Sequence, residues 1–568
     1  MKASLSDLRI GTPSRVGRRL CSSAGLAVGL VALATAGVAQ AAPSPSVTRP
    51  LNARGTTART HRAAARPDGS SSSGTLYVNG STGTDGTTCR LSNHPCQTIG
   101  YAYSIAQSGD TISVAKGTYP EQLTLTENIT IKGAGSSGAN ATIIAPTTVT
   151  SNDIDTDSST PQAAIVDFAS GVTAGNLQGV EINGGGTAGA AAASLNGSCA
   201  GPDYIGVYYH DASGSMTNVQ ITGVEQTQDL FGCQSGANGG VYVASDSGST
   251  SAVSMTKLTV TAYEKNGITC DDVGTTCTIT GAKVTGLGPI PTTTASWENQ
   301  AQNGIQVYGA SAAISQTTVQ GDNYTSPQYS PPSNYTYYTA AGILVINAGT
   351  LSLSDNTVKD NDANIYAMWY PGYGLGPASQ GTWSITGNIA SNATNDTGTV
   401  AGSTAVPVGD GFGDGIDLDG PSNVTVSGNT ANTEKEYGIG LLDATSATVS
   451  GNTTSSGSGE GIYVGDNPYT VNQVTGAASG IAANTGASTA NVVSDNTAKS
   501  NKLDGILADI LAQDSGNTFT GNILTSNHRY DAEDLSTGSG TGGTANTWSG
   551  NACTPAADGS PEATCTGS

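Results

Sequence analysis

Short alternating runs of hydrophobic and polar residues recur along most of the chain, separated by glycine and asparagine. In the clearest stretch a Gly-Ile pair begins at Gly415, Gly438 and Gly461, a spacing of 23 residues. A Ser-Gly-Asn-Thr turn recurs at the same spacing, with its asparagine at Asn429 and Asn452. Each repeat therefore contains an alternating strand, a turn, a second alternating strand and a second turn.

A repeat this short cannot hold two helices, and alternation with a period of two residues is typical of strands. It suits one coil of a parallel β-helix, in which every strand pairs with the strands one coil above and below. The pattern predicts an all-β fold, a single right-handed parallel β-helix with Ile and Val in its interior. Asparagines stacked at equivalent turns are expected to form hydrogen-bonded amide ladders.

The ends of the repeat region carry patterns typical of caps, which protect the open core and the strand edges of a solenoid. Residues 97–107 show the amphipathic pattern of a short helix that would close the N-terminal end. The motifs that follow are Gly109-Asp110-Thr111-Ile112-Ser113-Val114, Gly117-Thr118-Tyr119-Pro120, Asn128-Ile129-Thr130-Ile131 and Gly133-Ala134-Gly135. This run resembles the opening coil of pectate-lyase-like β-helix proteins. The resemblance implies the fold and carries no catalytic residue with it.

A second set of motifs lies in the middle and at the C-terminal end of the chain. They are Glu264-Lys265-Asn266-Gly267-Ile268, Gln302-Asn303-Gly304-Ile305, Ala341-Gly342-Ile343-Leu344, Tyr530-Asp531-Ala532-Glu533 and Asn546-Thr547-Trp548-Ser549-Gly550-Asn551. With them the chain resembles exported actinobacterial proteins with right-handed parallel β-helix repeats. The two resemblances span most of residues 75–568, and they imply fold and export but no activity.

Three regions are expected along the chain. The first 42 residues are predicted to be an export signal, because basic residues from Arg9 to Arg19 precede an apolar run and Ala39-Gln40-Ala41 fits a cleavage site. Residues 43–74 are expected to form a disordered linker rich in Pro, Ser, Thr and Ala. The β-helix with its caps occupies residues 75–568. No later segment reaches the roughly 20 apolar residues of a membrane span, so a secreted, extracellular protein is expected.

Charge is divided unevenly between these regions. The chain has 21 Lys and Arg against 43 Asp and Glu; the first 75 residues hold 10 and 2 of these, which leaves 11 against 41 in the body, a net charge of −30. Such a body is not expected to bind nucleic acid or an anionic membrane. A polyanionic substrate would also be repelled unless a cation bound between the two.

Eight of the nine cysteines lie beyond the predicted export signal and fall into local pairs. The pairs are Cys89 with Cys96, Cys199 with Cys233, Cys270 with Cys277, and Cys553 with Cys565. An even number of cysteines in an exported chain favours disulfides. Metal ligation is the alternative, although no pair has the two-residue spacing of a zinc knuckle.

Longer segments interrupt the repeat just before the Gly-Ile strand, near 183–203, 225–239, 287–302, 321–340 and 391–413. Since they occupy one position of the repeat, they are expected to lie along one edge of the solenoid, as binding loops often do. Aromatic residues are concentrated in or near them: Trp297, Tyr324, Tyr329, Tyr335, Tyr337, Tyr338, Trp369 and Tyr370. Aromatic rings stack on the apolar faces of sugars, so these residues are predicted to bind a polysaccharide. The alternative is that the loops fold on their own aromatics and cover the core.

A dense acidic cluster offers a second candidate site. Asp410, Asp414, Asp417 and Asp419 fall within ten residues, and oxygen ligands at this density could bind calcium. The alternative is a role in the turn, because aspartate recurs at nearly the position of Asp419 in the next two repeats.

A catalytic set is harder to identify. Lyases of this fold use a Lys or Arg base together with a cation, and glycosidases need paired carboxylates. Lys265 and Arg529 are isolated cations, and residues 271–272 are an isolated acidic pair. His210, followed by Asp211, could act as a base, although a turn histidine at the end of a strand is favoured.

Two functions follow from these patterns. The first is a secreted protein without catalysis that binds cell-wall or environmental polysaccharide, or that serves as a surface scaffold. The second is a polysaccharide lyase, epimerase or hydrolase acting on uronate-containing glycans, which rests on the fold resemblance. Retention of glycans and release of new chain ends distinguish the two.

Overall fold

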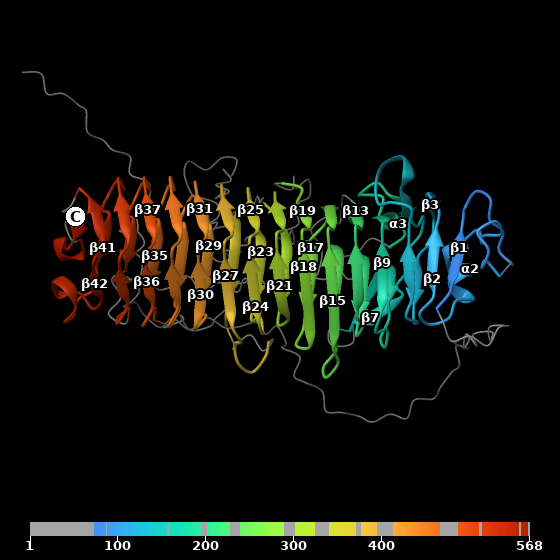
Figure 1. Cartoon of the computed structure of the whole chain (residues 1–568), viewed down its shortest axis with the longest axis horizontal. Helices are drawn as coiled ribbons and strands as arrows, with labels where there is room; N and C mark the ends of the chain where they lie inside the picture. The colour runs from blue at the N-terminus through green and yellow to red at the C-terminus, as the bar shows by residue number, and fades with distance from the viewer. Residues whose placement is uncertain are drawn as a thin grey trace, which may run out of the picture. The chain divides into compact units, whose positions relative to one another are not determined.

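The computed structural model describes residues 73–86, 88–155, 159–195, 201–227, 239–288, 302–323, 340–370, 376–394, 413–465, 487–509, 514–555 and 558–565. In these ranges the chain winds into a right-handed parallel β-helix whose coils follow one another from β1 to β44 (Figure 1). The predicted export signal and all but the last two residues of the predicted linker lie outside the described residues.

Three sheets, A, B and C, run along the stack, and each coil contributes one strand to each sheet. Sheet A consists of β1 (Thr75–Val78), β2 (Thr111–Val114), β5 (Thr130–Lys132), β9 (Gly175–Gln178), β12 (Gly214–Thr217), β15 (Ser251–Thr256), β18 (Thr275–Thr280), β21 (Ser311–Ser315), β24 (Leu351–Ser354), β27 (Trp383–Thr386), β30 (Val424–Ser427), β33 (Thr448–Ser450), β36 (Val492–Ser494), β39 (Thr518–Thr520) and β42 (Thr547–Ser549). Sheet B consists of β3 (Gly117–Tyr119), β6 (Thr142–Ile144), β10 (Glu181–Asn183), β13 (Gln220–Val224), β16 (Thr259–Tyr263), β19 (Lys283–Thr285), β22 (Thr318–Gln320), β25 (Thr357–Lys359), β28 (Ile389–Ser391), β31 (Thr430–Asn432), β34 (Thr453–Ser455), β37 (Thr497–Lys499), β40 (Ile523–Thr525) and β43 (Ala552–Thr554).

Sheet C matters most for the candidate site. It consists of β4 (Leu123–Leu125), β8 (Thr160–Phe168), β11 (Asp203–His210), β14 (Gly239–Ala244), β17 (Asn266–Asp271), β20 (Asn303–Tyr308), β23 (Ala341–Ile346), β26 (Ala363–Met368), β29 (Ile416–Asp419), β32 (Ile439–Leu442), β35 (Ile462–Gly465), β38 (Ile506–Ala508), β41 (Ala532–Asp534) and β44 (Gly559–Ser560). One further strand, β7 (Asp153–Asp155), leaves the helical path and pairs antiparallel with β8. The predicted insertions each fall between a strand of sheet B and the next strand of sheet C.

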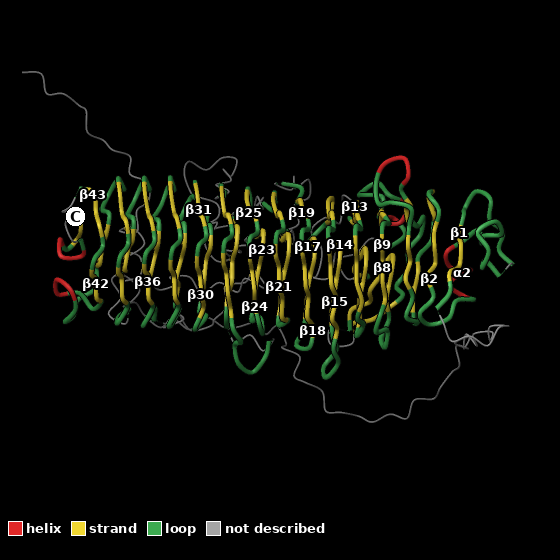
Figure 2. The backbone as a smooth tube through the Cα atoms, viewed as in Figure 1, coloured by secondary structure: helices red, strands yellow, loops and turns green. Residues whose placement is uncertain are grey.

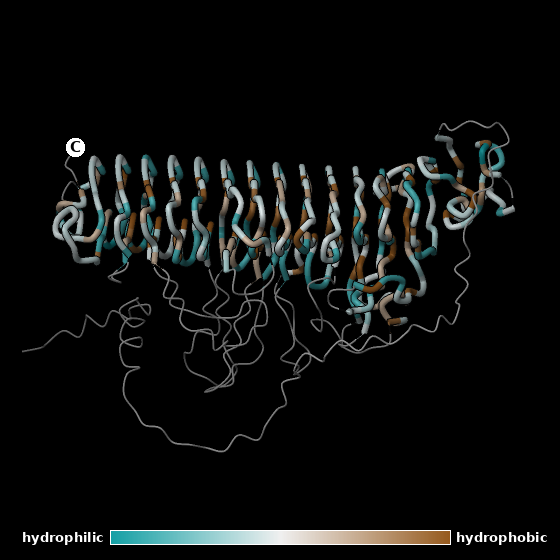
Figure 3. Tube along the Cα trace, turned by 90° about the horizontal axis from the view of Figure 1, so that it is seen from below, coloured by the Kyte–Doolittle hydropathy of each residue, from teal (hydrophilic) through white to brown (hydrophobic). Residues whose placement is uncertain are grey.

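The repeat places equivalent residues on top of one another. On the inner side of sheet A, for example, Ile314, Leu353 and Ile385 pair in register in successive coils and are fully buried. Hydrophobic residues recur from coil to coil in this way (Figure 3). Because each strand alternates between the interior and the outside, a thin core of Ile, Val and Leu runs through the stack.

The predicted asparagine ladder is present at the turn between sheets A and B. The Nδ2 of each side chain donates to the Oδ1 of the next over distances of 2.9–3.0 Å, through Asn356, Asn388, Asn429, Asn452, Asn496, Asn522 and Asn551. These side chains are buried. The ladder therefore satisfies amide groups that would otherwise be buried without hydrogen bonds.

The described part of the chain contains few helices, and they are short (Figure 2). The helix α2 (Ile99–Ser104) packs beside β1 and β2, and the Oγ1 of Thr98 accepts a hydrogen bond from the N–H of Tyr101 at its N-terminus. It is shorter than the predicted 97–107. The others are α3 (Ala190–Ala193), η1 (Gly138–Asn140), η3 (Thr541–Gly543) and η4 (Glu562–Thr564). None of these helices has the length and hydrophobicity needed to cross a membrane.

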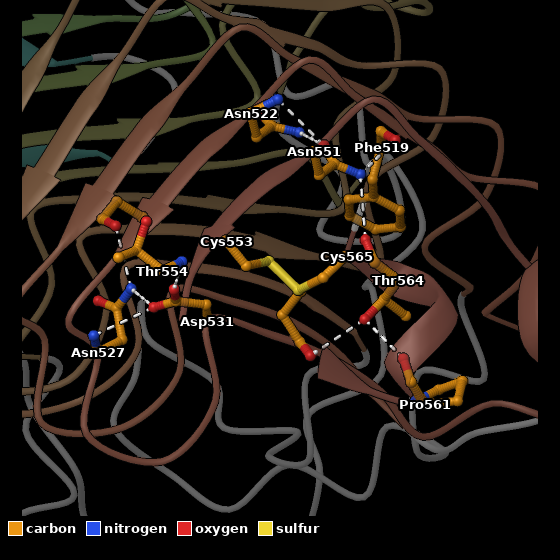
Figure 4. The surroundings of a disulfide bond; sticks show 12 residues. Phe519, Asn522, Asn527, Asp531, Asn551, Cys553, Thr554, Pro561, Thr564 and Cys565 are labelled. Carbon is orange, nitrogen blue, oxygen red and sulfur yellow. Dashed lines mark hydrogen bonds between the residues drawn. A yellow bond between two sulfur atoms is a disulfide. The ribbon is translucent and has the colours of Figure 1, made fainter. Parts of the chain in front are cut away.

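Three of the four predicted disulfides are confirmed. Cys89 bonds to Cys96, Cys270 to Cys277 and Cys553 to Cys565, whereas Cys199 and Cys233 lie outside the described residues. Cys553, on β43, and Cys565, after η4, tie the C-terminal segment to the last coil (Figure 4). The disulfide closes the end of the core beside the last asparagine of the ladder.

Candidate functional site

The outer side of sheet C differs from that of sheet A. The central outward row of sheet C, aligned by the pairing register, reads Asp167, Tyr208, Tyr242, Thr269, Gln306, Leu344, Tyr366, Asp417, Gly440, Tyr463, Leu507 and Glu533. The corresponding row of sheet A reads Ser215, Ser254, Thr278, Ala313, Ser352, Ser384, Thr425 and Thr448. Tyrosines and carboxyl groups are therefore gathered on sheet C, and we call its outward side the C face.

Near the N-terminal end of the C face, three rings stack on one another. The ring centroids of Tyr208 and Tyr242 are 5.1 Å apart with an interplanar angle of 13°, and those of Tyr208 and His210 are 5.2 Å apart with an angle of 10°. The two tyrosines belong to a hydrophobic cluster separate from the main core. Parallel pairing of β11 with β14 places them opposite one another.

Carboxylates surround His210. Its Nδ1 lies 2.8 Å from the Oδ2 of Asp153, on β7, and its Nε2 lies 3.2 Å from the Oδ1 of Asp246. Burial alone would lower the pKa of His210, but its contacts with Asp153 and then with Asp246 outweigh burial and raise the pKa to about 9. The imidazole is therefore cationic at neutral pH when only protein groups surround it.

Asp167 lies beside Tyr208 in the same row and is fully buried. The side chain of Thr124, its partner on β4, favours the ionised form of the carboxyl group, but burial opposes this effect more strongly. Burial, and then the charge of Asp153, raise the pKa of Asp167 to about 8. At neutral pH this carboxyl group mainly holds a proton, so it can donate a hydrogen bond.

The acidic pair at 271–272 lies one coil beyond Tyr242. The hydroxyl of Tyr242 donates to the Oδ2 of Asp271 over 3.2 Å. Burial and then the charge of Asp272 raise the pKa of Asp271 well above its usual range. The structure thus brings together three features that the sequence left apart: His210, the pair at 271–272 and the tyrosines of β11 and β14.

In the middle of the C face, Tyr308, Leu344 and Tyr370 are half-buried and pack on Tyr366 and its neighbours. Tyr366 donates a hydrogen bond to the Oδ2 of Asp419 over 3.2 Å, and Tyr370 donates to its Oδ1. These half-buried side chains are the part of the C face that a large ligand reaches most directly.

Two of the eight predicted aromatic ligand-binding residues fall in the described ranges. Tyr370 lies on the C face, as above. Trp369 is half-buried and meets the core Trp383 edge-on, with ring centroids 6.2 Å apart. The other six predicted residues, Trp297, Tyr324, Tyr329, Tyr335, Tyr337 and Tyr338, lie outside the described residues.

Three of the four predicted calcium ligands are described, and all are buried. Asp417 and Asp419 point outward from β29, and Asp414 precedes that strand and accepts a hydrogen bond from the N–H of Tyr437. Burial, followed by the charges of Asp414 and Asp419, raises the pKa of Asp417 well above its usual range. These three aspartates do not form a close ligand group by themselves. Because Asp410 lies outside the described residues, calcium binding stays a prediction.

The two isolated cations are engaged by acidic residues. Burial lowers the pKa of Lys265 to about 8, and the nearby Asp322 partly offsets this effect. Arg529 forms ion pairs with Asp504 and Glu533 near the C-terminal end.

A family model described as periplasmic copper-binding protein (NosD) matches residues 290–489. No curated protein matches the chain. Similar solved structures include the GH136 lacto-N-biosidase from Eubacterium ramulus, with 12% identity over 78% of this chain and 64% of that chain and a TM-score of 0.33. The Dettilon tailspike protein (gp208) has 14% identity over 79% of this chain and 67% of that chain, with a TM-score of 0.39.

The A-module of the mannuronan C-5 epimerase AlgE4 from Azotobacter vinelandii is similar over 72% of this chain and 86% of that chain, with 11% identity and a TM-score of 0.35. The chain thus spans less than two thirds of the length of the lacto-N-biosidase. At these identities the likeness concerns the parallel β-helix fold alone.

Proposed function

We propose that this chain is an exported protein that binds polysaccharide along the C face. The observation that carries the proposal is the in-register row of tyrosines and carboxyl groups on one outward side of a long solenoid. Tyrosine rings stack on the apolar faces of sugars, and carboxyl groups accept hydrogen bonds from sugar hydroxyls. The tyrosines and carboxyl groups of the row are buried, so a polymer lying along the stack would first meet the half-buried Tyr308, Leu344 and Tyr370.

Export is part of the same proposal. Disulfides persist in oxidising compartments outside the cytoplasm, and the chain has disulfides near both ends and in the middle of the β-helix. An extracellular location follows from the predicted export signal at 1–42.

The half-buried Tyr308 provides the most direct test. A ring stack contributes about 0.5–1.5 kcal/mol, so Tyr308→Ala should weaken glycan binding by about 2- to 12-fold. Tyr308→Phe keeps the ring and should bind nearly as well as the wild type. Binding would be measured by affinity electrophoresis against plant, algal and bacterial polysaccharides.

The matched control is Tyr77→Ala, because Tyr77 is a half-buried tyrosine on sheet A, where no comparable row exists. If Tyr77→Ala weakens glycan binding as much as Tyr308→Ala does, the C face is not the binding surface. If none of the polysaccharides retains the wild-type chain, the proposed binding function is wrong.

The second candidate is an enzyme that acts on uronate-containing glycans as a lyase, epimerase or hydrolase. The observation in its favour is a carboxyl group that holds a proton, Asp167, close to a cationic imidazole, His210. Release of new chain ends, or of an absorbing unsaturated product, would support this function. Retention of a glycan without new chain ends or an unsaturated product would favour the binding function over the enzymatic one.

A further inference from the structure

The C face holds one compact group of potential metal ligands. His210 ends β11 and Asp211 follows it, while Asp246 lies two residues beyond β14, the next strand of sheet C. One ligand atom from each of these residues lies within 4.8 Å of the other two. Among the described residues this is the only group of three or more such side chains that meets this spacing.

The ring of His210 is held in the orientation that a metal ligand needs. Its Nδ1 lies 2.8 Å from Asp153, and once a metal ion displaces the proton on Nε2, a histidine that donates Nδ1–H to a carboxylate presents the lone pair of Nε2 on the other side. This Nε2 is buried, and it lies in an ion pair with the Oδ1 of Asp246, one of the candidate ligands. It is therefore a buried nitrogen directed at the group of carboxylates.

The spacing across the site also fits a shared ion. Nε2 lies 3.2 Å from the Oδ1 of Asp246. Two ligands about 2.1 Å from one ion are separated by roughly 3.0–3.4 Å in octahedral or tetrahedral geometry.

Asp211 is fixed by the backbone around it. Its φ is 50°, a left-handed conformation, and its Oδ1 accepts a hydrogen bond of 2.8 Å from the N–H of Asp246. The hydroxyl of Ser170 lies 3.4 Å from its Oδ2. This hydrogen bond links Asp211 directly to Asp246. The strand β7 brings Asp153 to His210, the third candidate ligand.

We infer that His210, Asp211 and Asp246 bind one divalent transition-metal ion, with Asp153 as the residue that orients the histidine. One imidazole and two carboxylates suit ions such as Zn²⁺, whereas Ca²⁺ prefers six to eight oxygen ligands. Asp246 keeps 22% of its side chain exposed, which leaves a path for the ion. His210 and Tyr308 lie three coils apart on sheet C, so metal binding and glycan binding can be measured independently.

The competing explanation is that His210 is simply a cation paired with Asp153 and Asp246. This explanation predicts no metal binding, which makes the two distinguishable.

The test is a titration of the purified exported chain, first stripped of metal with a chelator, with Zn²⁺ in competition with a chromophoric chelator. The expected result is one Zn²⁺ bound per wild-type chain. The affinity for Zn²⁺ should fall by at least about 100-fold in His210→Gln and in Asp246→Asn. Asp153→Asn should weaken binding by about 10- to 100-fold, since it acts through the ring. His94→Gln changes an exposed histidine far along the chain and should bind as the wild type does.

X-ray absorption of the Zn²⁺-loaded chain should show one imidazole nitrogen among oxygen ligands. The inference would be overturned if the wild type does not bind Zn²⁺ tightly. It would also be overturned if folded Asp246→Asn and His210→Gln bind Zn²⁺ as tightly as the wild type does. If His210→Gln fails to fold, Asp246→Asn still decides, because its side chain is partly exposed and keeps nearly the same shape.

Discussion

At the scale of single residues, buried carboxyl groups have the largest consequences. Glu434 is 1% exposed and accepts hydrogen bonds from the N–H of Ala393 and the side chain of Asn364. Burial outweighs these bonds and raises the pKa of Glu434 to about 8. The folded chain therefore keeps a proton on Glu434 at a pH where the unfolded chain has lost it.

This shift predicts how stability depends on pH. Below a pH of about 4.5 both states hold the proton; between about 4.5 and 8 only the folded state does, so the free energy of unfolding falls as pH rises through this window. In Glu434→Gln the residue no longer titrates. The loss of stability between pH 5 and pH 8, measured by denaturant unfolding, should therefore be smaller in Glu434→Gln than in the wild type. An identical loss in both would show that Glu434 is not the titrating group.

His210 shows what could be predicted at this scale. Its position at the end of a strand is as expected, and the alternation in Tyr208-Tyr209-His210 already places Tyr208 and His210 on the same side. The partners of His210 could not be predicted, because Asp153 comes from a strand that runs against the helical path and Asp246 from the next coil. Neither contact leaves a local pattern in the sequence.

At the scale of elements, the asparagine ladder links the coils through their turns. Asn452 accepts hydrogen bonds from the side chain and the N–H of Asn429, and it donates to Asn496 and to the carbonyl of Val426. Removal of its amide leaves several buried groups without a partner.

Asn452→Ala should therefore lower the free energy of unfolding by about 2–4 kcal/mol, because each buried unsatisfied group costs about 1–3 kcal/mol. The control is Thr448→Ala, which changes an exposed residue of sheet A in the same coil. Urea unfolding followed by circular dichroism gives both values. A loss under 0.5 kcal/mol in Asn452→Ala, on the order expected for a surface change, would contradict a structural role for the ladder.

The same repeat explains why the fold was predictable. A spacing of 23 residues with alternating strands fixes the coil, the inward residues and the ladder positions. The helix at the N-terminal cap was placed correctly, but its ends were set by Thr98 as the N-cap and by Ile105, which an amphipathic pattern does not define. The strand β7 was missed because it belongs to no repeat.

At the scale of the whole molecule, the net charge of −30 over the body after residue 75 should govern which glycans bind. Polyuronates carry one carboxylate per sugar and are repelled, whereas neutral glycans are not. Neutral polysaccharides should therefore be retained more strongly than polyuronates at low ionic strength. The difference should shrink at about 0.5 M salt, where charges are screened beyond a few ångströms. Stronger retention of polyuronates at low salt and without divalent cations would contradict this expectation.

The C face is the central claim, and hydrogen–deuterium exchange with and without a retained oligosaccharide tests it most directly. Exchange is expected to slow in β20, β23 and β26 and in the residues around Tyr370, while sheets A and B of the same coils remain unchanged. Protection confined to sheet A or sheet B, or protection absent at saturating oligosaccharide, would contradict binding along the C face.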